Sequence, residues 1–174
     1  GDIGEFDDEG FLKITDRKKD LFKLSTGKYV MPQPIENRMG SDPLVDNAVV
    51  VGSDHKFCAA LVFPSLEQVR AQAKEFGLDT EQDIDDLLAE PDIVGAFQSI
   101  VQSANEGMDH WSTVKRFALI PDELTVESDL LTPTLKIRRP RVHDAYADEI
   151  EALYRSEEGF PGPRTARGAV LTAV

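Results

Sequence analysis

Two groups of basic side chains are the residues of this sequence best suited to chemistry. The 174-residue chain carries 32 Asp and Glu against 19 Lys and Arg, a formal net charge of −13, yet residues 13–38 and residues 136–141 each carry a net charge of +4. Clustered cations attract anionic ligands such as phosphates. Two solvated faces would give the same pattern, so charge alone leaves both interpretations open. The basic residues are Lys13, Arg17, Lys18, Lys19, Lys23, Lys28 and Arg38 in the first group and Lys136, Arg138, Arg139 and Arg141 in the second.

Other kinds of site find little support. His55, His110 and His143 lie far apart and match no metal-ligand spacing, so we expect surface or boundary positions and no metal site. The single cysteine, Cys58, excludes an internal disulfide, and its apolar surroundings predict a core position. Neither a nucleophile-elbow nor a phosphate-loop glycine motif occurs. The acid excess argues against nucleic acid as a partner, and no apolar run approaches the roughly 20 residues of a transmembrane segment.

The two basic groups belong to longer motifs whose order and spacing are specific. The first runs from Gly1-Asp2 through Asp16-Arg17-Lys18-Lys19-Asp20 and Ser25-Thr26-Gly27-Lys28 to Pro32-Gln33-Pro34-Ile35-Glu36. The second is Leu130-Leu131-Thr132-Pro133-Thr134-Leu135-Lys136. Together they resemble the AMP-forming adenylating enzymes, and in detail the long-chain fatty acyl-CoA synthetases (fatty acid–CoA ligases). The resemblance extends over residues 1–155, and it implies that the chain is the small mobile C-terminal domain of such an enzyme.

The resemblance also implies roles for individual residues. Lys136 would be the catalytic lysine of adenylation and a nucleotide contact, and Arg17 would act beside it as a catalytic residue at the ribose and phosphates. Asp2 would bind the ribose hydroxyls of the nucleotide. Lys19 would be the hinge about which the domain rotates. The turn formed by Ser25, Thr26, Gly27 and Lys28 would face the active site beside the CoA channel during thioester formation.

The chemistry of adenylation suits these assignments. A carboxylate meets the α-phosphate of ATP while pyrophosphate leaves, and a flexible ammonium can bridge the two groups of oxygens. Each residue also has a simpler interpretation. A lone lysine such as Lys136 is usually solvated, Gly27 suits any hairpin turn, and Asp16 with Arg17 could form a strand-end ion pair.

The reaction implied by the resemblance has two steps, both requiring a partner domain. ATP and a fatty acid would give acyl-adenylate and pyrophosphate, and CoA would then give acyl-CoA and AMP. ATP with Mg²⁺ would be held mainly by an N-terminal adenylation domain, whose phosphate loop and acyl pocket do not occur in this sequence. We therefore expect the chain to be inactive alone, to bind no cofactor tightly, and to act in the cytoplasm, with a peripheral position at the inner membrane as the alternative.

Two alternatives remain open at this point. One is another adenylating ligase, for aryl or shorter acids or for loading a carrier protein, because only the Leu131–Lys136 and Gly27–Val30 details favour long-chain acids. The other is a stand-alone binding or interaction module that uses its basic groups to bind nucleotides or acidic partners.

The hydrophobic and turn patterns of the sequence predict the elements that position these residues. They indicate an α+β fold, with short β-hairpins and a small mixed sheet packed by about five helices. Hairpins are expected over residues 3–14 and 21–30, and strands over 45–52, 57–63 and 114–120. Five helices are expected: a short one over residues 35–39, one after Ser65 with Gln68 completing a capping box, one after Thr80, one from Pro91 to Gly107 and one from Pro140 to Leu153. We expect residues 1–18 to belong to the adenylation domain, residues 19–156 to form the C-terminal domain, and residues 157–174 to be a flexible tail.

Overall fold

The computed structural model describes residues 2–6, 12–17, 21–155 and 169–174, and for the first two of these stretches it describes the backbone alone. Lys19 therefore lies outside the described residues, and the side chains of Asp2 and Arg17 do as well.

Two short antiparallel hairpins open the chain, as predicted. Strand β1 (Asp2–Phe6) pairs with β2 (Leu12–Arg17), and β3 (Phe22–Lys23) pairs with β4 (Tyr29–Val30). Gly27 closes the second hairpin with a φ of 87°, a conformation that glycine adopts without the steric cost of a Cβ.

A four-stranded mixed sheet forms the centre of the molecule. Its strands are β5 (Val45–Val51), β6 (Cys58–Pro64), β7 (Val114–Leu119) and β8 (Val170–Ala173), in that spatial order. The β6–β7 pair is parallel, and the two outer pairs are antiparallel. All seven residues of β6 are buried, as expected for an interior strand covered on both faces.

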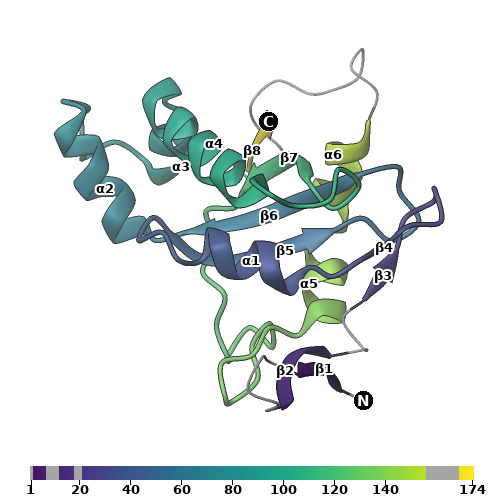
Figure 1. The fold of residues 1–174 in the computed structure, drawn as a ribbon. Coiled ribbons are helices and arrows are strands. Elements are labelled where there is room, and N and C mark those ends of the chain that lie inside the picture. The colour runs from purple at the N-terminus through teal and green to yellow at the C-terminus, as the bar shows by residue number, and fades with distance from the viewer. Residues whose placement is uncertain (1, 7–11, 18–20, 156–168) are drawn as a thin grey trace.

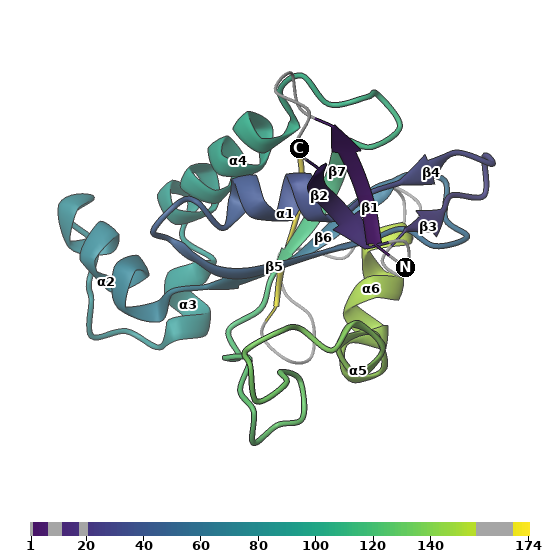
Figure 2. The same cartoon turned by 60° about the horizontal axis from the view of Figure 1, so that its bottom comes forward.

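Helices cover both faces of this sheet (Figures 1 and 2). One face carries α1 (Gln33–Met39), α2 (Leu66–Glu75), α3 (Ile84–Leu88) and α4 (Pro91–Asn105). The other carries α5 (Arg139–Ala145), α6 (Ala147–Tyr154) and the loop that leads into them. The α+β prediction is confirmed, with six helices among the described residues. None of these helices is both long enough and apolar enough to cross a bilayer.

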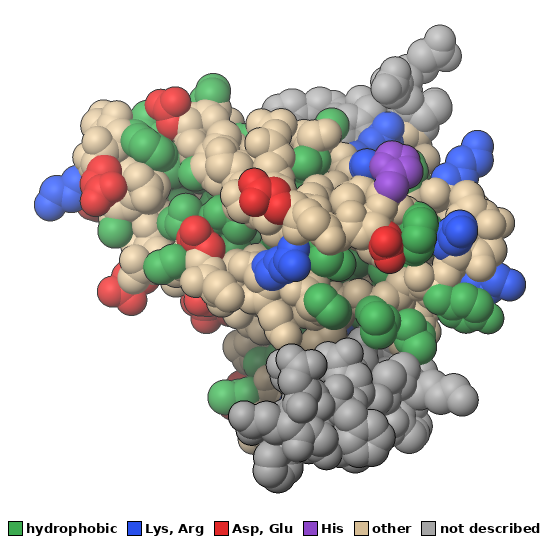
Figure 3. Space-filling view, in the orientation of Figure 1, with side chains coloured by type: hydrophobic (Ala, Val, Ile, Leu, Met, Phe, Trp, Pro, Cys, Tyr) green, Lys and Arg blue, Asp and Glu red, His purple; other side chains and the backbone are tan. Residues whose placement is uncertain are grey.

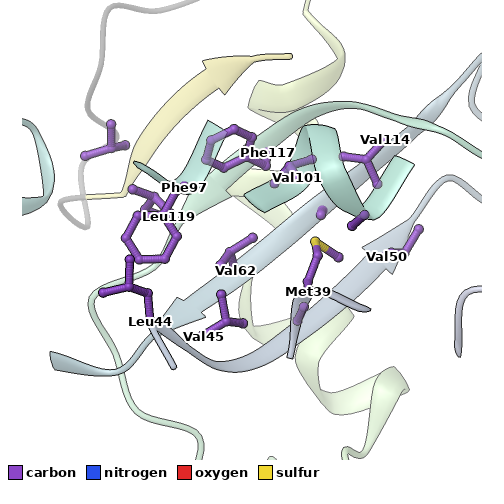
Figure 4. Close-up of a cluster of buried hydrophobic side chains, with 14 of the residues drawn as sticks. Met39, Leu44, Val45, Val50, Val62, Phe97, Val101, Val114, Phe117 and Leu119 are labelled. Atoms are coloured by element: carbon purple, nitrogen blue, oxygen red, sulfur yellow. The ribbon is translucent and has the colours of Figure 1, made fainter. Parts of the chain in front are cut away.

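The core between the sheet and α1–α4 shows why the predicted helical faces form. Ile93, Phe97, Val101 and Ala104 recur at helical spacing along α4, and all four are buried. In Figure 4 the side chains of Phe97 and Val101 lie near Leu119 and Val114 of β7, in the same buried cluster as Met39 of α1. Burial of each such side chain contributes about 1.5–3 kcal/mol. The labelled strand residues of this cluster are Val45, Val50, Val62, Val114, Phe117 and Leu119.

The chain end differs from the prediction of a flexible tail over residues 157–174. Residues 156–168 lie outside the described part, but Val170–Ala173 forms strand β8, with Val170 opposite Leu119. Ala169, Val170 and Leu171 are buried. The tail prediction is therefore wrong for these last residues, because hydrogen bonds to β7 and burial against the core stabilise a segment too short to show a strand pattern.

The last helix and two helix starts also differ from prediction. The backbone of Tyr146 leaves the helical region, with φ −116° and ψ 29°, and divides the predicted helix into α5 and α6. The Tyr146 hydroxyl and Asp122 Oδ2 lie 3.1 Å apart, so this tyrosine fastens the break to the preceding loop. The Ser65 side chain makes no capping bond, and Asp83 rather than Thr80 caps α3 by accepting from the Asp85 N–H at 3.0 Å.

Candidate functional site

Lys136 follows directly on a tight turn that projects from the loop before α5. The backbone of Leu131 bridges to Ile137, and the Thr132 N–H donates to the Lys136 carbonyl at 2.8 Å. Within the turn, the Leu135 N–H donates to the Thr132 carbonyl at 2.8 Å. The Lys136 N–H donates to Thr132 Oγ1 at 3.0 Å. These bonds fix the backbone of Lys136 while its side chain remains exposed.

The arginines that follow Lys136 are paired with carboxylates, and two of them share the same one. Arg138 and Arg141 form ion pairs with opposite oxygens of Asp129, at 2.5 and 3.0 Å, and Arg139 pairs with Glu36. Across the part of the chain that the structure describes, the Lys136 ammonium makes no ion pair. Within the second basic group, Lys136 is therefore the one cation without an ion-pair partner among the described residues, beside three paired arginines.

Glu36 connects the segment that carries Lys136 to the sheet. Its side chain is 8% exposed, its Oε1 accepts from the Val50 N–H at 2.7 Å, and its Oε2 pairs with Arg139. One carboxylate thus connects α1, the outer strand β5 and the first residue of α5. Because Arg139 is three residues from Lys136, the pair also limits where the lysine turn can lie. The sequence contains no local signal for this pair, whose members are 103 residues apart.

The turn formed by Ser25, Thr26, Gly27 and Lys28 is exposed, and backbone hydrogen bonds connect its hairpin to the loop that follows β5. The Ser25 N–H donates to the His55 carbonyl at 2.9 Å, and the Asp54 N–H donates to the Lys23 carbonyl at 3.0 Å. At its far side, Lys28 Nζ lies 4.6 Å from the centroid of the Trp111 ring, a cation–π contact. The turn therefore stands on a rigid support at the sheet end.

His55 and Tyr154 form that support, a role that the sequence did not reveal. Their rings stack with centroids 3.6 Å apart, and the Tyr154 hydroxyl donates to the carbonyls of Val51 and Phe57 at 3.0 and 3.1 Å. Burial lowers the pKa of His55, while the nearby carboxylate of Asp54 opposes that shift. The neutral form is thereby favoured, which suits a stacking role. No local pattern relates residues so far apart in the sequence.

Cys58 occupies the core position predicted for it. It is fully buried in β6, and burial raises the pKa of its thiol to about 12. Since the thiolate is the reactive form, this cysteine is chemically inert in the folded protein.

Gly52, at the end of β5, allows the β3–β4 hairpin to approach the sheet. A Cβ at this position would lie 2.9 Å from Phe22 Cε2 and 3.1 Å from Leu24 Cδ2. We expect Gly52→Ala to displace the hairpin and to lower the free energy of unfolding by about 1–3 kcal/mol, measured by urea denaturation. Gly95→Ala in α4 is the matched control, because its added Cβ meets nothing within 4 Å, and we expect a gain of about 0.5–1 kcal/mol. Equal stability of Gly52→Ala and the unmodified chain would contradict this account.

The predicted site residues fall into separate parts of the molecule. The β3–β4 hairpin projects at one end of the sheet, and the loop that carries Lys136 lies apart from it in both ribbon views (Figures 1 and 2). In the first hairpin, the backbone register places Asp2 directly opposite Arg17. Figure 3 shows acidic side chains over α2–α4 and basic ones gathered around the β3–β4 hairpin. No group of three or more His, Cys, Asp or Glu side chains among the described residues could hold a metal ion.

Comparisons with known proteins show the family to which this chain belongs. The model of the AMP-binding enzyme C-terminal domain matches residues 19–158. The long-chain-fatty-acid–CoA ligase FadD15 of Mycobacterium tuberculosis is 33% identical over 157 residues, covering 90% of this chain and 26% of that protein. Human long-chain-fatty-acid–CoA ligase 1 is 34% identical over 157 residues, covering 88% and 22%.

Structural similarity extends to a further group of adenylating proteins. The A domain of a carboxylic acid reductase from Segniliparus rugosus, solved with AMP and a co-purified carboxylic acid, matches with a TM-score of 0.65 and 26% identity, covering 88% of this chain and 22% of that one. The chain thus spans about a quarter of the length of the proteins it matches. Because the family model matches most of the sequence, and relatives above 30% identity cover about nine-tenths of it, the chain belongs to the family of AMP-binding enzyme C-terminal domains.

Proposed function

We propose that this chain serves as the C-terminal domain of an ATP-dependent long-chain fatty acid–CoA ligase. The observation that carries the proposal is the place of Lys136: its exposed ammonium has no ion-pair partner among the described residues, and it directly follows an exposed, hydrogen-bonded turn while its neighbouring arginines are paired. The names of the relatives FadD15 and human long-chain-fatty-acid–CoA ligase 1 support the long-chain class.

In the first half-reaction, Lys136 would act at the reacting oxygens. A carboxylate oxygen of the fatty acid attacks the α-phosphorus of ATP, and the bond to pyrophosphate breaks. The ammonium would lie between the carboxylate and the α-phosphate, where it offsets the charge that accumulates on the transferring group. Asp2 and Arg17, which face each other in the backbone register, would contact the ribose and phosphates of the nucleotide.

In the second half-reaction, the turn from Ser25 to Lys28 would replace Lys136 at the site. The CoA sulfur attacks the acyl carbonyl, the acyl–oxygen bond breaks, and AMP leaves. Rotation about Lys19 would exchange the two surfaces, which accords with their separate positions in the fold (Figure 1).

The ligands of this reaction would be held largely outside the chain. The described residues contain no cluster of metal ligands, so the proposal assigns Mg²⁺, together with ATP, to the N-terminal adenylation domain. The chain alone would catalyse neither step. A cytoplasmic location belongs to the same proposal.

Substrate preference tests the proposal directly. In the complete enzyme that carries this domain, we expect kcat/KM for acyl-CoA formation to be at least about a hundredfold higher with hexadecanoate than with acetate or benzoate. AMP release and acyl-CoA are measured together, with the isolated chain as the blank. A preference for benzoate would instead identify an aryl-CoA ligase.

A second candidate, a domain that loads a carrier protein, is favoured by the similarity to the carboxylic acid reductase of Segniliparus rugosus, which has also been solved as an A-PCP didomain. In that case the enzyme would form acyl-adenylate from hexadecanoate yet produce no acyl-CoA when CoA is supplied. ATP–pyrophosphate exchange with hexadecanoate, measured beside acyl-CoA formation, therefore separates the two.

A further inference from the structure

We propose that Leu135 is an apolar anchor through which this domain docks onto its adenylation domain in the adenylate-forming arrangement. The inference rests on the proposed function and adds a positioning residue to it. Three features of Leu135 carry the argument: its backbone conformation, its exposure and its place in the chain.

The backbone of Leu135 is held in an unfavourable conformation. Its φ is 59°, in the left-handed region that glycine, asparagine and aspartate adopt with least cost. Hydrogen bonds on either side, from Leu135 N–H to the Thr132 carbonyl and from Thr132 N–H to the Lys136 carbonyl, keep it there. A glycine or asparagine at this position would stabilise the same turn better than leucine does.

The side chain of Leu135 is buried very little by the rest of this chain. At 71% exposure it is the most exposed of the large hydrophobic side chains in the described part of the molecule. It borders a shallow hollow also lined by Phe63, Leu124 and Leu131, but its exposure shows that it does not fill that hollow. A residue that is both strained and solvated lowers the stability of the isolated domain, so any compensating contact must form in another arrangement.

The adjacent lysine identifies that arrangement. Neighbouring Cα atoms are about 3.8 Å apart, so Lys136 cannot enter a site built on another domain without bringing Leu135 to the surface of that domain. The preceding residues Thr132, Pro133 and Thr134 carry no charge, which leaves the turn suited to an apolar contact in a chain with a net charge of −13. The relatives hold roughly three-quarters of their length outside the matched region, which is where the partner surface would lie.

Substitutions in the complete enzyme separate this role from a structural one. Leu135→Asn keeps a residue that tolerates positive φ and removes the apolar contact, so we expect adenylation, followed by ATP–pyrophosphate exchange, to fall about tenfold or more. Thioester formation from preformed acyl-adenylate should stay within about twofold of the unmodified enzyme, because this half-reaction would use the other surface. The thermal midpoint of the isolated chain should stay unchanged or rise.

Two further variants serve as controls. Leu135→Met restores an apolar side chain and should recover most of the adenylation lost in Leu135→Asn. Phe76→Asn alters another exposed hydrophobic residue, 43% exposed at the end of α2, and should leave both half-reactions unchanged.

The possible outcomes distinguish this inference from the proposed function. Normal adenylation in Leu135→Asn, together with its loss in Lys136→Ala, would reject the anchor and retain the proposed function. Normal adenylation in both variants would reject the proposed function itself. Loss of both half-reactions in Leu135→Asn, with a lowered thermal midpoint, would show a structural role and overturn the anchor.

Discussion

Lys136→Ala in the complete enzyme is expected to reduce adenylation by about a hundredfold to a thousandfold, the loss typical of removing one preorganised group that stabilises transition-state charge. The turn around Lys136 is fixed by backbone bonds to Thr132, and the side chain is exposed, so truncation should leave the fold intact. ATP–pyrophosphate exchange with hexadecanoate measures the first half-reaction alone.

The second half-reaction provides the internal control for this variant. Thioester formation from preformed hexadecanoyl-adenylate and CoA should proceed at nearly the original rate, because the turn from Ser25 to Lys28 would then face the site. Lys74→Ala, at an exposed lysine in the last turn of α2, is the matched control for loss of one positive charge and should leave both rates unchanged. An equal loss of both half-reactions in Lys136→Ala would show that the lysine has no special role in adenylation.

Local patterns were sufficient to predict most of the fold. The helical spacing of Ile93, Phe97 and Val101 and the β-branched segments around β5 and β6 predicted elements that the structure confirms. Such patterns succeed because a helix or hairpin exposes one face to the core over a few successive residues. Strand β8 escaped prediction because its partner β7 lies about 50 residues earlier and only four residues take part.

The candidate site was predictable in its motifs but not in its electrostatics. The segments around Lys136 and Gly27 carry the resemblance to the family, and the family is confirmed. That Arg138, Arg139 and Arg141 are paired depends on where Asp129 and Glu36 lie in the folded chain. Charge counted along a sequence cannot distinguish a paired cation from an available one, because ion pairs form across elements distant in the chain.

Glu36→Ala is expected to lower the free energy of unfolding by about 3 kcal/mol, the largest stability loss that we predict for a single residue of this domain. The substitution removes both the acceptor of the Val50 N–H on β5 and the carboxylate that pairs with Arg139. The Val50 N–H belongs to a buried residue of an outer strand, so its loss of a partner adds a desolvation cost to the loss of the ion pair. Urea denaturation of the isolated chain, followed by circular dichroism, measures the effect.

Two companion variants divide this loss into its parts. Glu36→Gln keeps an oxygen that can accept from the Val50 N–H and removes only the charge, so it should lose about half as much stability as Glu36→Ala. Glu127→Ala, at an exposed glutamate in the loop before the Lys136 turn, should change the free energy of unfolding by less than about 0.5 kcal/mol. If Glu36→Ala were no less stable than Glu127→Ala, the contacts of Glu36 between α1, β5 and α5 would contribute nothing to the free energy of unfolding. The Lys136 turn would then owe its position to its own hydrogen bonds alone.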